Sequence, residues 1–244
     1  MLIYESMIKN FQLVPKRANA KLLLRHSIRP QSNDRYADFS WGLTREGKEF
    51  AKLLGKYLGG HLDKKFKVNI EKAKTSASPR CKETLKMILQ GYGKHIAIQE
   101  EIILHSMWIE DKDRWDKVFR KYDKKMEILL QKMLDKEYLD GVYPVNLSVA
   151  KMLRVMDFYG NTTNKQPDKN SLYRLDIFVT HDSLIMLLLA YLFGKNVAEI
   201  EWIYMLEGCI LWFEDSILYF AWRGNKYNIR LEPTILELIM QKEI

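Results

Sequence analysis

Three times along the chain, a short strand-like segment leads into a polar loop and then into a helix-like pattern. These segments are the apolar runs Lys21–Leu24 and Leu175–Thr180 and the more polar segment around Ile70–Thr75. Short apolar runs bounded by loops are typical of buried strands, and helices between strands allow neighbouring strands to run parallel. We therefore predict an α/β fold with a mostly parallel central sheet that helices flank on both faces.

Local signals mark the helices of these three units. Thr44 is a typical N-cap for a first helix that ends at Gly59, and Pro79 suits the first turn of a second. The apolar stretch Leu184–Phe193 predicts a third helix, which Gly194 would close. After this helix the composition changes to short strand-like runs separated by turns, so the chain is expected to end in hairpins and a short helix.

A long charged stretch separates the second unit from the third. Between Lys112 and Lys136 an apolar stripe recurs at helical spacing, which predicts one long helix, and a further helix is expected at Leu147–Phe158. A chain of 244 residues is long enough for one sizeable core with an elaboration. We predict a single α/β domain over residues 1–244, with a helical cap insertion at residues 110–171.

The net charge of +8 favours anionic ligands in general. Acidic residues interleave with the basic ones in the long charged helix, which argues against a nucleic-acid partner. The longest apolar run has about half of the roughly 20 residues that a membrane-spanning helix needs, so no membrane partner is expected. Two cysteines, Cys81 and Cys209, suit a reducing compartment, and we predict a cytoplasmic protein. The oligomeric state stays open.

Arginine, histidine and aspartate side chains follow the three predicted strands. They are Arg25, His26 and Arg29 in RHSIRP, Arg80 in TSASPRCKET, and His181 and Asp182 in VTHD. The carboxyl ends of parallel strands meet at one edge of a sheet. Arginines that converge there repel one another unless an anion lies between them, and guanidinium groups match phosphoryl oxygens. Their charge also lowers the pKa of a nearby histidine, which leaves a neutral, nucleophilic nitrogen. The pattern predicts a phosphate pocket.

In this order, LLLRHSIRP, TSASPRCKET and VTHD resemble the histidine phosphatase superfamily over about residues 20–222. The resemblance implies a phosphoglycerate mutase-like fold and a phosphatase that hydrolyses a small-molecule phosphomonoester through a phosphohistidine on His26. It implies inorganic phosphate as product, with no cofactor and no metal. Four residues would bind the phosphoryl group: Arg25, Arg29, Arg80 and His181.

Two positions distinguish the branches of the superfamily. The mutase-like branch has Ser or Thr four places after the first arginine and Gly after the last histidine, where this chain has Arg29 and Asp182. The chain therefore resembles the histidine acid phosphatase branch more closely, and in that branch the aspartate is the general acid. We predict Asp182 as the acid. The mutase-like branch uses a glutamate after the middle motif, which makes Glu101 the alternative.

Two other functions stay open. One is phosphomutase-type transfer between hydroxyl groups, against which Arg29 speaks. The other is a catalytically silent phosphoanion-binding module, because Ser27 replaces the glycine of the family motif. His105 lies nearest to the Glu101 stretch, and a structural role is expected for it. Cys81 is expected to pack within a helix rather than to act as a nucleophile.

Overall fold

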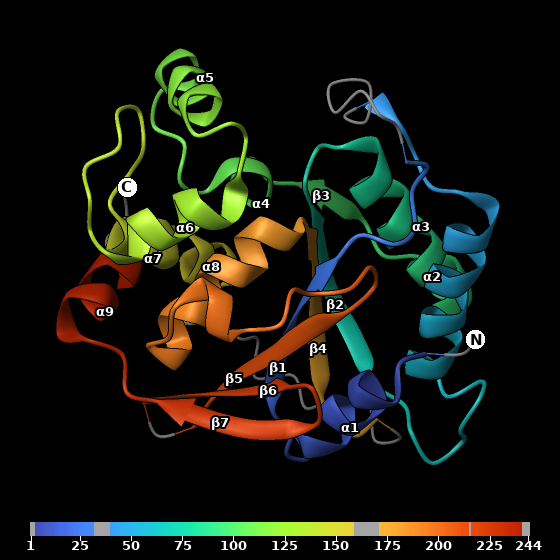
Figure 1. The fold of residues 1–244 in the computed structure, drawn as a ribbon. Helices are drawn as coiled ribbons and strands as arrows, with labels where there is room; N and C mark the ends of the chain where they lie inside the picture. Colours follow the sequence, from blue (N-terminus) through green and yellow to red (C-terminus); the bar gives the residue numbers. More distant parts are fainter. Residues whose placement is uncertain (1–2, 32–39, 159–170, 215, 241–244) are drawn as a thin grey trace.

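A mixed sheet forms the centre of the computed structural model, which describes residues 3–31, 40–158, 171–214 and 216–240 (Figure 1). In these residues seven strands follow the order β3-β2-β4-β1-β5-β6-β7. Their bounds are β1 Asn19–Arg25, β2 Asn69–Thr75, β3 Ile98–Glu100, β4 Arg174–Thr180, β5 Gly208–Glu214, β6 Ile217–Trp222 and β7 Asn225–Ile229.

The sheet has a parallel half and an antiparallel half. Strands β3, β2, β4 and β1 pair in parallel, and β5, β6 and β7 continue the sheet from β1 as antiparallel neighbours. Arg25 is level with Thr180, and Thr75 with Val179, so β1, β2 and β4 end at the same edge. The predicted α/β fold is confirmed, and the antiparallel half corresponds to the predicted hairpins.

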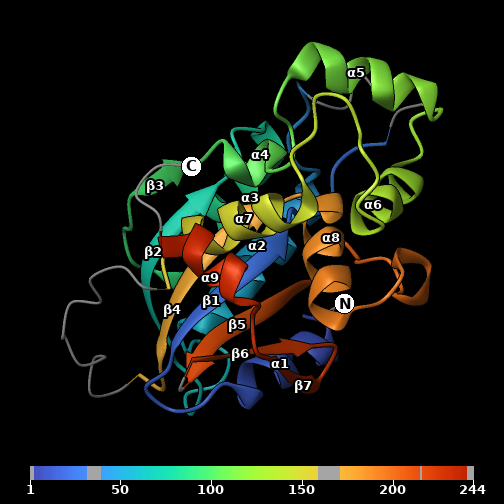
Figure 2. The same ribbon diagram turned by 90° about the vertical axis from the view of Figure 1, so that its left-hand side faces the viewer.

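Helices cover both faces of the sheet, as Figures 1 and 2 show. One face carries α1 Glu5–Leu13, α2 Arg45–Leu58 and α3 Pro79–Tyr92. The helices on the side of the other face are α4 Ile103–Ser106, α5 Lys112–Lys121, α6 Met126–Leu134, α7 Val145–Val155, α8 Asp182–Phe193 and α9 Pro233–Met240. A short 3-10 helix, Val197–Glu199, follows α8. No helix of the described residues is long and apolar enough to cross a membrane.

The apolar run of β1 is buried because both of its faces are covered. Leu22 packs in the core beneath α1 to α3, and Leu23 packs in the core beneath the helices of the other face. Side chains of successive strand residues point to opposite faces, so a strand buried on both sides needs a continuous apolar run rather than an alternating one. This explains the apolar runs of β1 and β4, whereas β2, in which buried residues alternate with more exposed ones, has a mixed sequence.

The predicted helix between Lys112 and Lys136 is wrong in one respect, because it is two helices. Asp123 and Lys124 have positive φ angles of 53° and 57°, a left-handed conformation that ends α5 and turns the chain into α6. Trp115 of α5 and Leu130 of α6 nevertheless bury in one core with the sheet. The last part of the predicted cap, residues 159–170, lies outside the described residues.

Candidate active site

The common carboxyl edge of β1, β2 and β4 brings the predicted residues together. Arg25 ends β1, and the backbone N–H of His26 donates to Thr180 O at 3.0 Å. His181 follows β4 directly. Arg80 lies in the first turn of α3, which begins at Pro79 after the loop that follows β2. The predicted convergence of three distant segments is thus present in the structure.

Three histidine rings form the middle of this site. The ring centroids of His26 and His181 are 5.7 Å apart, and those of His105 and His181 are 5.4 Å apart, both in edge-on arrangements. Ser76 joins two of the rings, since its Oγ is 3.1 Å from His181 Nε2 and 3.0 Å from His105 Nδ1. A continuous polar chain therefore runs from α4 to the end of β4.

His26 is held in the neutral form that a nucleophile requires. Its Nδ1 is 2.8 Å from Ser27 O, and a carbonyl only accepts, so Nδ1 carries the proton and Nε2 keeps a lone pair. Burial lowers the pKa of His26 to about 3, and the positive charges of Arg80 and Arg25 act in the same direction. Near neutral pH His26 is therefore an uncharged imidazole.

His181 is neutral as well, with its proton on the other nitrogen. Arg80 Nη2 is 3.2 Å from His181 Nδ1, and because a guanidinium only donates, Nδ1 is the acceptor. The ring proton then sits on Nε2 and faces the hydroxyl of Ser76. Burial lowers the pKa of His181, followed by the charge of Arg80. The positive charge at this edge thus resides on arginines.

Asp182 is paired with Arg25. Its Oδ2 is 2.7 Å from Arg25 Nη2 and accepts from Trp202 Nε1 at 3.2 Å, and its Oδ1 accepts from the N–H of Ser183 at 2.8 Å. Burial raises the pKa of Asp182, but Arg25 and these hydrogen bonds outweigh burial, so the pKa is lowered. These contacts favour the carboxylate and argue against the proton-donating role predicted for Asp182.

Arg29 and Glu101 lie on loops beside these residues. Arg29 is half-buried, and its Nη1 donates to Pro30 O at 3.0 Å. The N–H of Glu101 donates to Thr75 O at 2.9 Å, and its carboxylate is 2.7 Å from Lys74 Nζ. Glu101 therefore begins the segment that leads into α4 and to the third histidine.

Ser27, which replaces the glycine of the family motif, is fully buried. Its Oγ donates to Gly47 O at 2.8 Å, and its N–H donates to Thr84 Oγ1 at 2.9 Å. Both bonds lead into the helices beneath the loop, α2 and α3. The hydroxyl of Ser27 is therefore bonded to the backbone of α2. This serine gives no support to the hypothesis that the protein binds phosphate without catalysis.

Three residues of the site were missed in the sequence. Ser76 carries no signal beyond its place after a strand, and His105 was assigned a structural role because it lies in no recognisable motif. Trp202 belongs to no motif, and it is half-buried in the loop before β5, where it bonds to Asp182. Only the folded chain brings these side chains to the site.

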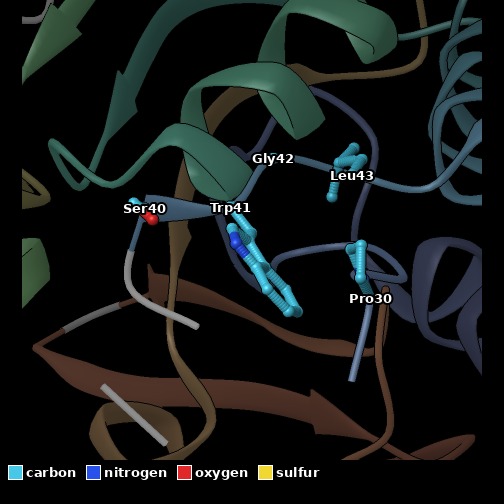
Figure 3. Close-up of a pocket in the computed structure, with 5 residues that line it drawn as sticks. All are labelled: Pro30, Ser40, Trp41, Gly42 and Leu43. Carbon is cyan, nitrogen blue, oxygen red and sulfur yellow. The ribbon is translucent and has the colours of Figure 1, made fainter. Parts of the chain in front are cut away.

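A pocket of about 440 Å³ lies beside the loop that follows the RHSIRP segment (Figure 3). Its lining residues are Pro30, Ser40, Trp41, Gly42 and Leu43. Figure 3 shows the indole of Trp41 extending toward Pro30. The pocket is lined by none of the histidines, so the chemistry lies elsewhere. Within the described ranges, no group of three or more His, Cys, Asp or Glu side chains has the arrangement of a metal site.

Solved structures of several phosphatases and mutases share this fold. Bacillus stearothermophilus YhfR gives a TM-score of 0.56 at 16% identity, covering 85% of this chain and 98% of that one. Phosphoglycerate mutase from Bacillus anthracis gives 0.51 at 14% identity, covering 93% and 98%. Mycobacterial glucosyl-3-phosphoglycerate phosphatase gives 0.52 at 15%, covering 80% and 90%. At such identities these likenesses show the fold alone.

Sequence comparison identifies the family. A search of curated proteins finds no match. The profile of the histidine phosphatase superfamily (branch 1) matches residues 22–216, which is most of the chain. The predicted superfamily is confirmed, but the predicted closeness to the acid phosphatase branch is not supported. Arg29 and Asp182, on which that prediction rested, bond to a backbone carbonyl and to Arg25. The protein belongs to the histidine phosphatase superfamily, in its phosphoglycerate mutase-like branch 1.

Proposed function

We propose that this protein hydrolyses a small-molecule phosphomonoester through a phosphohistidine on His26. The observation that carries the proposal is the state of this ring. Its Nδ1 is committed to Ser27 O, its Nε2 keeps a lone pair, and its pKa is lowered to about 3. A buried, neutral imidazole beside two arginines suits nucleophilic attack on an anionic phosphoryl group.

In the first step, His26 Nε2 attacks phosphorus and the bond to the leaving oxygen breaks. The phosphoryl oxygens carry the developing charge, and we assign Arg25, Arg80 and the Nε2–H of His181, which would turn from Ser76, to stabilise it. The leaving oxygen takes a proton from a general acid. In the second step water attacks phosphorus and gives a proton to the conjugate base of that acid, the P–N bond breaks with its electron pair returning to His26 Nε2, and inorganic phosphate leaves.

Glu101 is our proposal for the general acid. Asp182 is engaged by Arg25 and Trp202 in ways that favour its anion. Branch 1 implies a glutamate after the middle motif, and Glu101 is the alternative that the sequence offered. Glu101 begins the segment that carries His105, whose ring lies 5.4 Å from that of His181. Its place in this segment is the support for Glu101 as the proton donor, and the proposal requires the ion pair between Glu101 and Lys74 Nζ, 2.7 Å long, to open before the carboxyl group can give a proton.

The test of the function is the variant His26→Ala, assayed on an aryl phosphate without added metal. We expect kcat/KM to fall at least about a thousandfold, since the nucleophile is lost. His95→Ala, which changes an exposed histidine, is the matched control and should keep its activity. Undiminished activity in His26→Ala would overturn the proposal.

Leaving-group dependence tests the acid. An acid matters most when the leaving oxygen is basic, so Glu101→Gln should lose about a hundredfold on an alkyl phosphate and much less on a nitrophenyl phosphate. Asp182→Asn should lose equally on both. If the selective loss belonged instead to Asp182→Asn, the acid role would return to Asp182.

The products separate the alternative functions. Free inorganic phosphate is expected, whereas an isomerised phosphoester without free phosphate would indicate a mutase. Phosphate binding without turnover over a broad panel of phosphomonoesters would indicate a silent binding module.

Two further proposals concern the cap and the compartment. Helix α5 projects beyond the carboxyl edge of the sheet at the top of Figure 2, which supports a substrate-covering role for residues 110–171. Cys81 and Cys209 are buried thiols, and burial raises their pKa to about 11 and about 12. Unpaired, inert thiols support a reducing compartment such as the cytoplasm.

A further inference from the structure

Residues 201–207, which precede β5, form one wall of the site; we call them the 201–207 segment. Ile203 O accepts from Arg25 Nη1 at 2.5 Å, and Trp202 Nε1 donates to Asp182 Oδ2 at 3.2 Å. The N–H of Leu206 donates to His26 O at 3.2 Å. One segment thus contacts the nucleophile's backbone, an arginine and its carboxylate partner.

Arg223, in the turn between β6 and β7, anchors this segment. Its Nε is 3.0 Å from Glu207 Oε1, and its Nη2 is 3.1 Å from Glu207 Oε2 and 3.1 Å from Trp202 O. Glu207 is only 2% exposed and also accepts from the N–H of Tyr204 at 2.9 Å. A buried carboxylate held by a two-pronged guanidinium fixes geometry closely.

Leu206 shows that the segment is held in place. Its φ is 62°, a left-handed conformation that a non-glycine residue adopts only where its surroundings determine it. The bonds around Glu207 and His26 lie on either side of this residue. The conformation that presents Trp202 and Ile203 to the site therefore depends on the anchor.

Arg25 is only partly satisfied by these contacts. Asp182 and Ile203 O engage Nη2 and Nη1, whereas its buried Nε has no hydrogen-bond partner among the described residues. A guanidinium has five N–H donors, and a buried donor without a partner is costly. The contacts orient the guanidinium and leave donors for an anion.

We propose that Trp202 and Arg223 are positioning residues, which hold Asp182 as the anionic partner of Arg25 and thereby orient Arg25 toward a phosphoryl group. This inference rests on the proposed function, because it assigns Arg25 to phosphate binding. It differs from the acid phosphatase branch, in which the aspartate serves the leaving group rather than an arginine. Neither residue touches the substrate.

The charge on Asp182 is set by the groups around it. The facing titratable or charged groups are Arg25 and His26 from the end of β1, Arg29 near Arg25, Arg80 of α3, His181, Tyr4 next to α1, and Glu207. Positive groups outnumber negative ones in this set. Loss of the Trp202 hydrogen bond would therefore raise the pKa of Asp182 while leaving it the main counter-charge to Arg25.

The experiment compares Trp202→Phe with Trp212→Phe. Trp212 is the matched control, because its Nε1 also donates to a carboxylate, Glu214 Oε1 at 3.2 Å, away from the site. Affinity for inorganic phosphate is measured by calorimetry from about pH 3.5 to pH 6, where phosphate is a monoanion, and the fold is followed by circular dichroism.

We expect Trp202→Phe to bind phosphate about tenfold more weakly, since one hydrogen bond to a charged group is lost. Its binding should also fail at a higher pH than in the wild type, because Asp182 takes up a proton earlier and Arg25 is released. Trp212→Phe should follow the wild type. Arg223→Lys, which keeps the charge but not the two-pronged contact, should shift both readouts in the same direction by a smaller factor.

Wild-type affinity and pH dependence in both Trp202→Phe and Arg223→Lys would overturn the inference. So would an alkaline shift of kcat at unchanged phosphate affinity, which a general acid at position 182 would produce. A failure of the proposed function can be told apart from a failure of this inference. If the proposed function fails, the wild type shows no turnover, or turnover that does not depend on His26. The phosphate titrations of the variants still decide the role of Trp202.

Discussion

Two ion pairs link the chain at β1 to the chain at β4, and they differ in every respect that matters for function. Lys21 Nζ is 2.5 Å from Asp176 Oδ2, with side chains 1% and 3% exposed, and the two residues are level across the strands. Arg25 Nη2 is 2.7 Å from Asp182 Oδ2 at the carboxyl edge, with side chains 14% and 30% exposed.

The inner pair, Lys21 with Asp176, has its charges and hydrogen bonds satisfied, whereas the edge pair, Arg25 with Asp182, does not. Asp176 uses its second oxygen to accept from the N–H of Lys72 at 3.0 Å, so charge and hydrogen bonds are satisfied. At the edge, Asp182 pairs with Arg25 beside histidines that stay neutral, and the buried Nε of Arg25 has no hydrogen-bond partner among the described residues. A buried ion pair whose charges and hydrogen bonds are satisfied stabilises the fold. An ion pair at a strand end that leaves a donor of the arginine unsatisfied is suited to binding an anion.

The largest expected effect breaks the inner pair. Asp176→Asn leaves the buried ammonium of Lys21 without its counter-charge, which should cost about 3–5 kcal/mol in the free energy of unfolding. Urea denaturation measures this loss, and kcat of the folded enzyme should stay unchanged. The double variant Lys21→Met with Asp176→Leu should recover most of the stability. A loss below about 1 kcal/mol in Asp176→Asn would contradict the comparison.

The corresponding change in the edge pair should lower kcat/KM strongly and leave the free energy of unfolding almost unchanged. Asp182→Asn frees Arg25 from its partner, so kcat/KM on an aryl phosphate should fall about a hundredfold. The half-exposed site can be rehydrated, and the free energy of unfolding should change by no more than about 1 kcal/mol. Parallel assays and urea titrations check both. An intact kcat/KM with a large stability loss would make the edge pair structural.

The neutral histidines give the stability of the protein a pH dependence that arises at the edge of the sheet. Because the pKa of His26 is about 3 when folded and about 6.5 when unfolded, the unfolded chain binds more protons between these values. Its contribution to stability is full above about pH 6.5 and falls by about 1.4 kcal/mol per pH unit below it. Urea titrations at pH 7 and pH 5 should show this slope, and His26→Ala should reduce it by about 1.4 kcal/mol per pH unit, since His181 and His105, whose pKa values are also lowered, still contribute. An equal slope in both proteins would refute the burial argument.

The smallest effect concerns the serine between two rings. Ser76→Ala removes the hydroxyl that bonds to His105 and His181, and kcat/KM should fall about tenfold, which corresponds to one hydrogen bond. Ser148→Ala removes a buried hydroxyl on α7 that bonds to backbone carbonyls, and it serves as the control. Equal kcat/KM values in the two variants would show that Ser76 does not contribute to catalysis.

Much of the fold could be predicted because local and tertiary signals agree. Thr44 caps α2 by accepting from Gly47 N–H at 3.0 Å, Pro79 begins α3, and Gly194 closes α8 in a left-handed conformation. The break between α5 and α6 was missed because Asp123 and Lys124 are neither glycine nor proline. Their left-handed backbone arises from packing two apolar stripes into one core, which a periodic pattern does not reveal.

The site could be predicted only in part. His26, Arg80 and His181 follow strands or open a helix, so topology places them. The role of Asp182 depends on what it contacts, and those contacts come from Arg25 and from Trp202, twenty residues away in a loop. The branch prediction relied on the identities of Arg29 and Asp182, and identity without contacts favoured the wrong branch.

The most direct test of the account is to detect the covalent intermediate. Enzyme mixed with an aryl phosphate is quenched within one turnover in alkali, where phosphohistidine survives, and the peptide that contains His26 is analysed by mass spectrometry. The account predicts one phosphoryl group on His26, absent from His26→Ala, that forms and decays as phosphate is released. Turnover without any phosphorylated enzyme, or with the phosphoryl group on another residue, would contradict it.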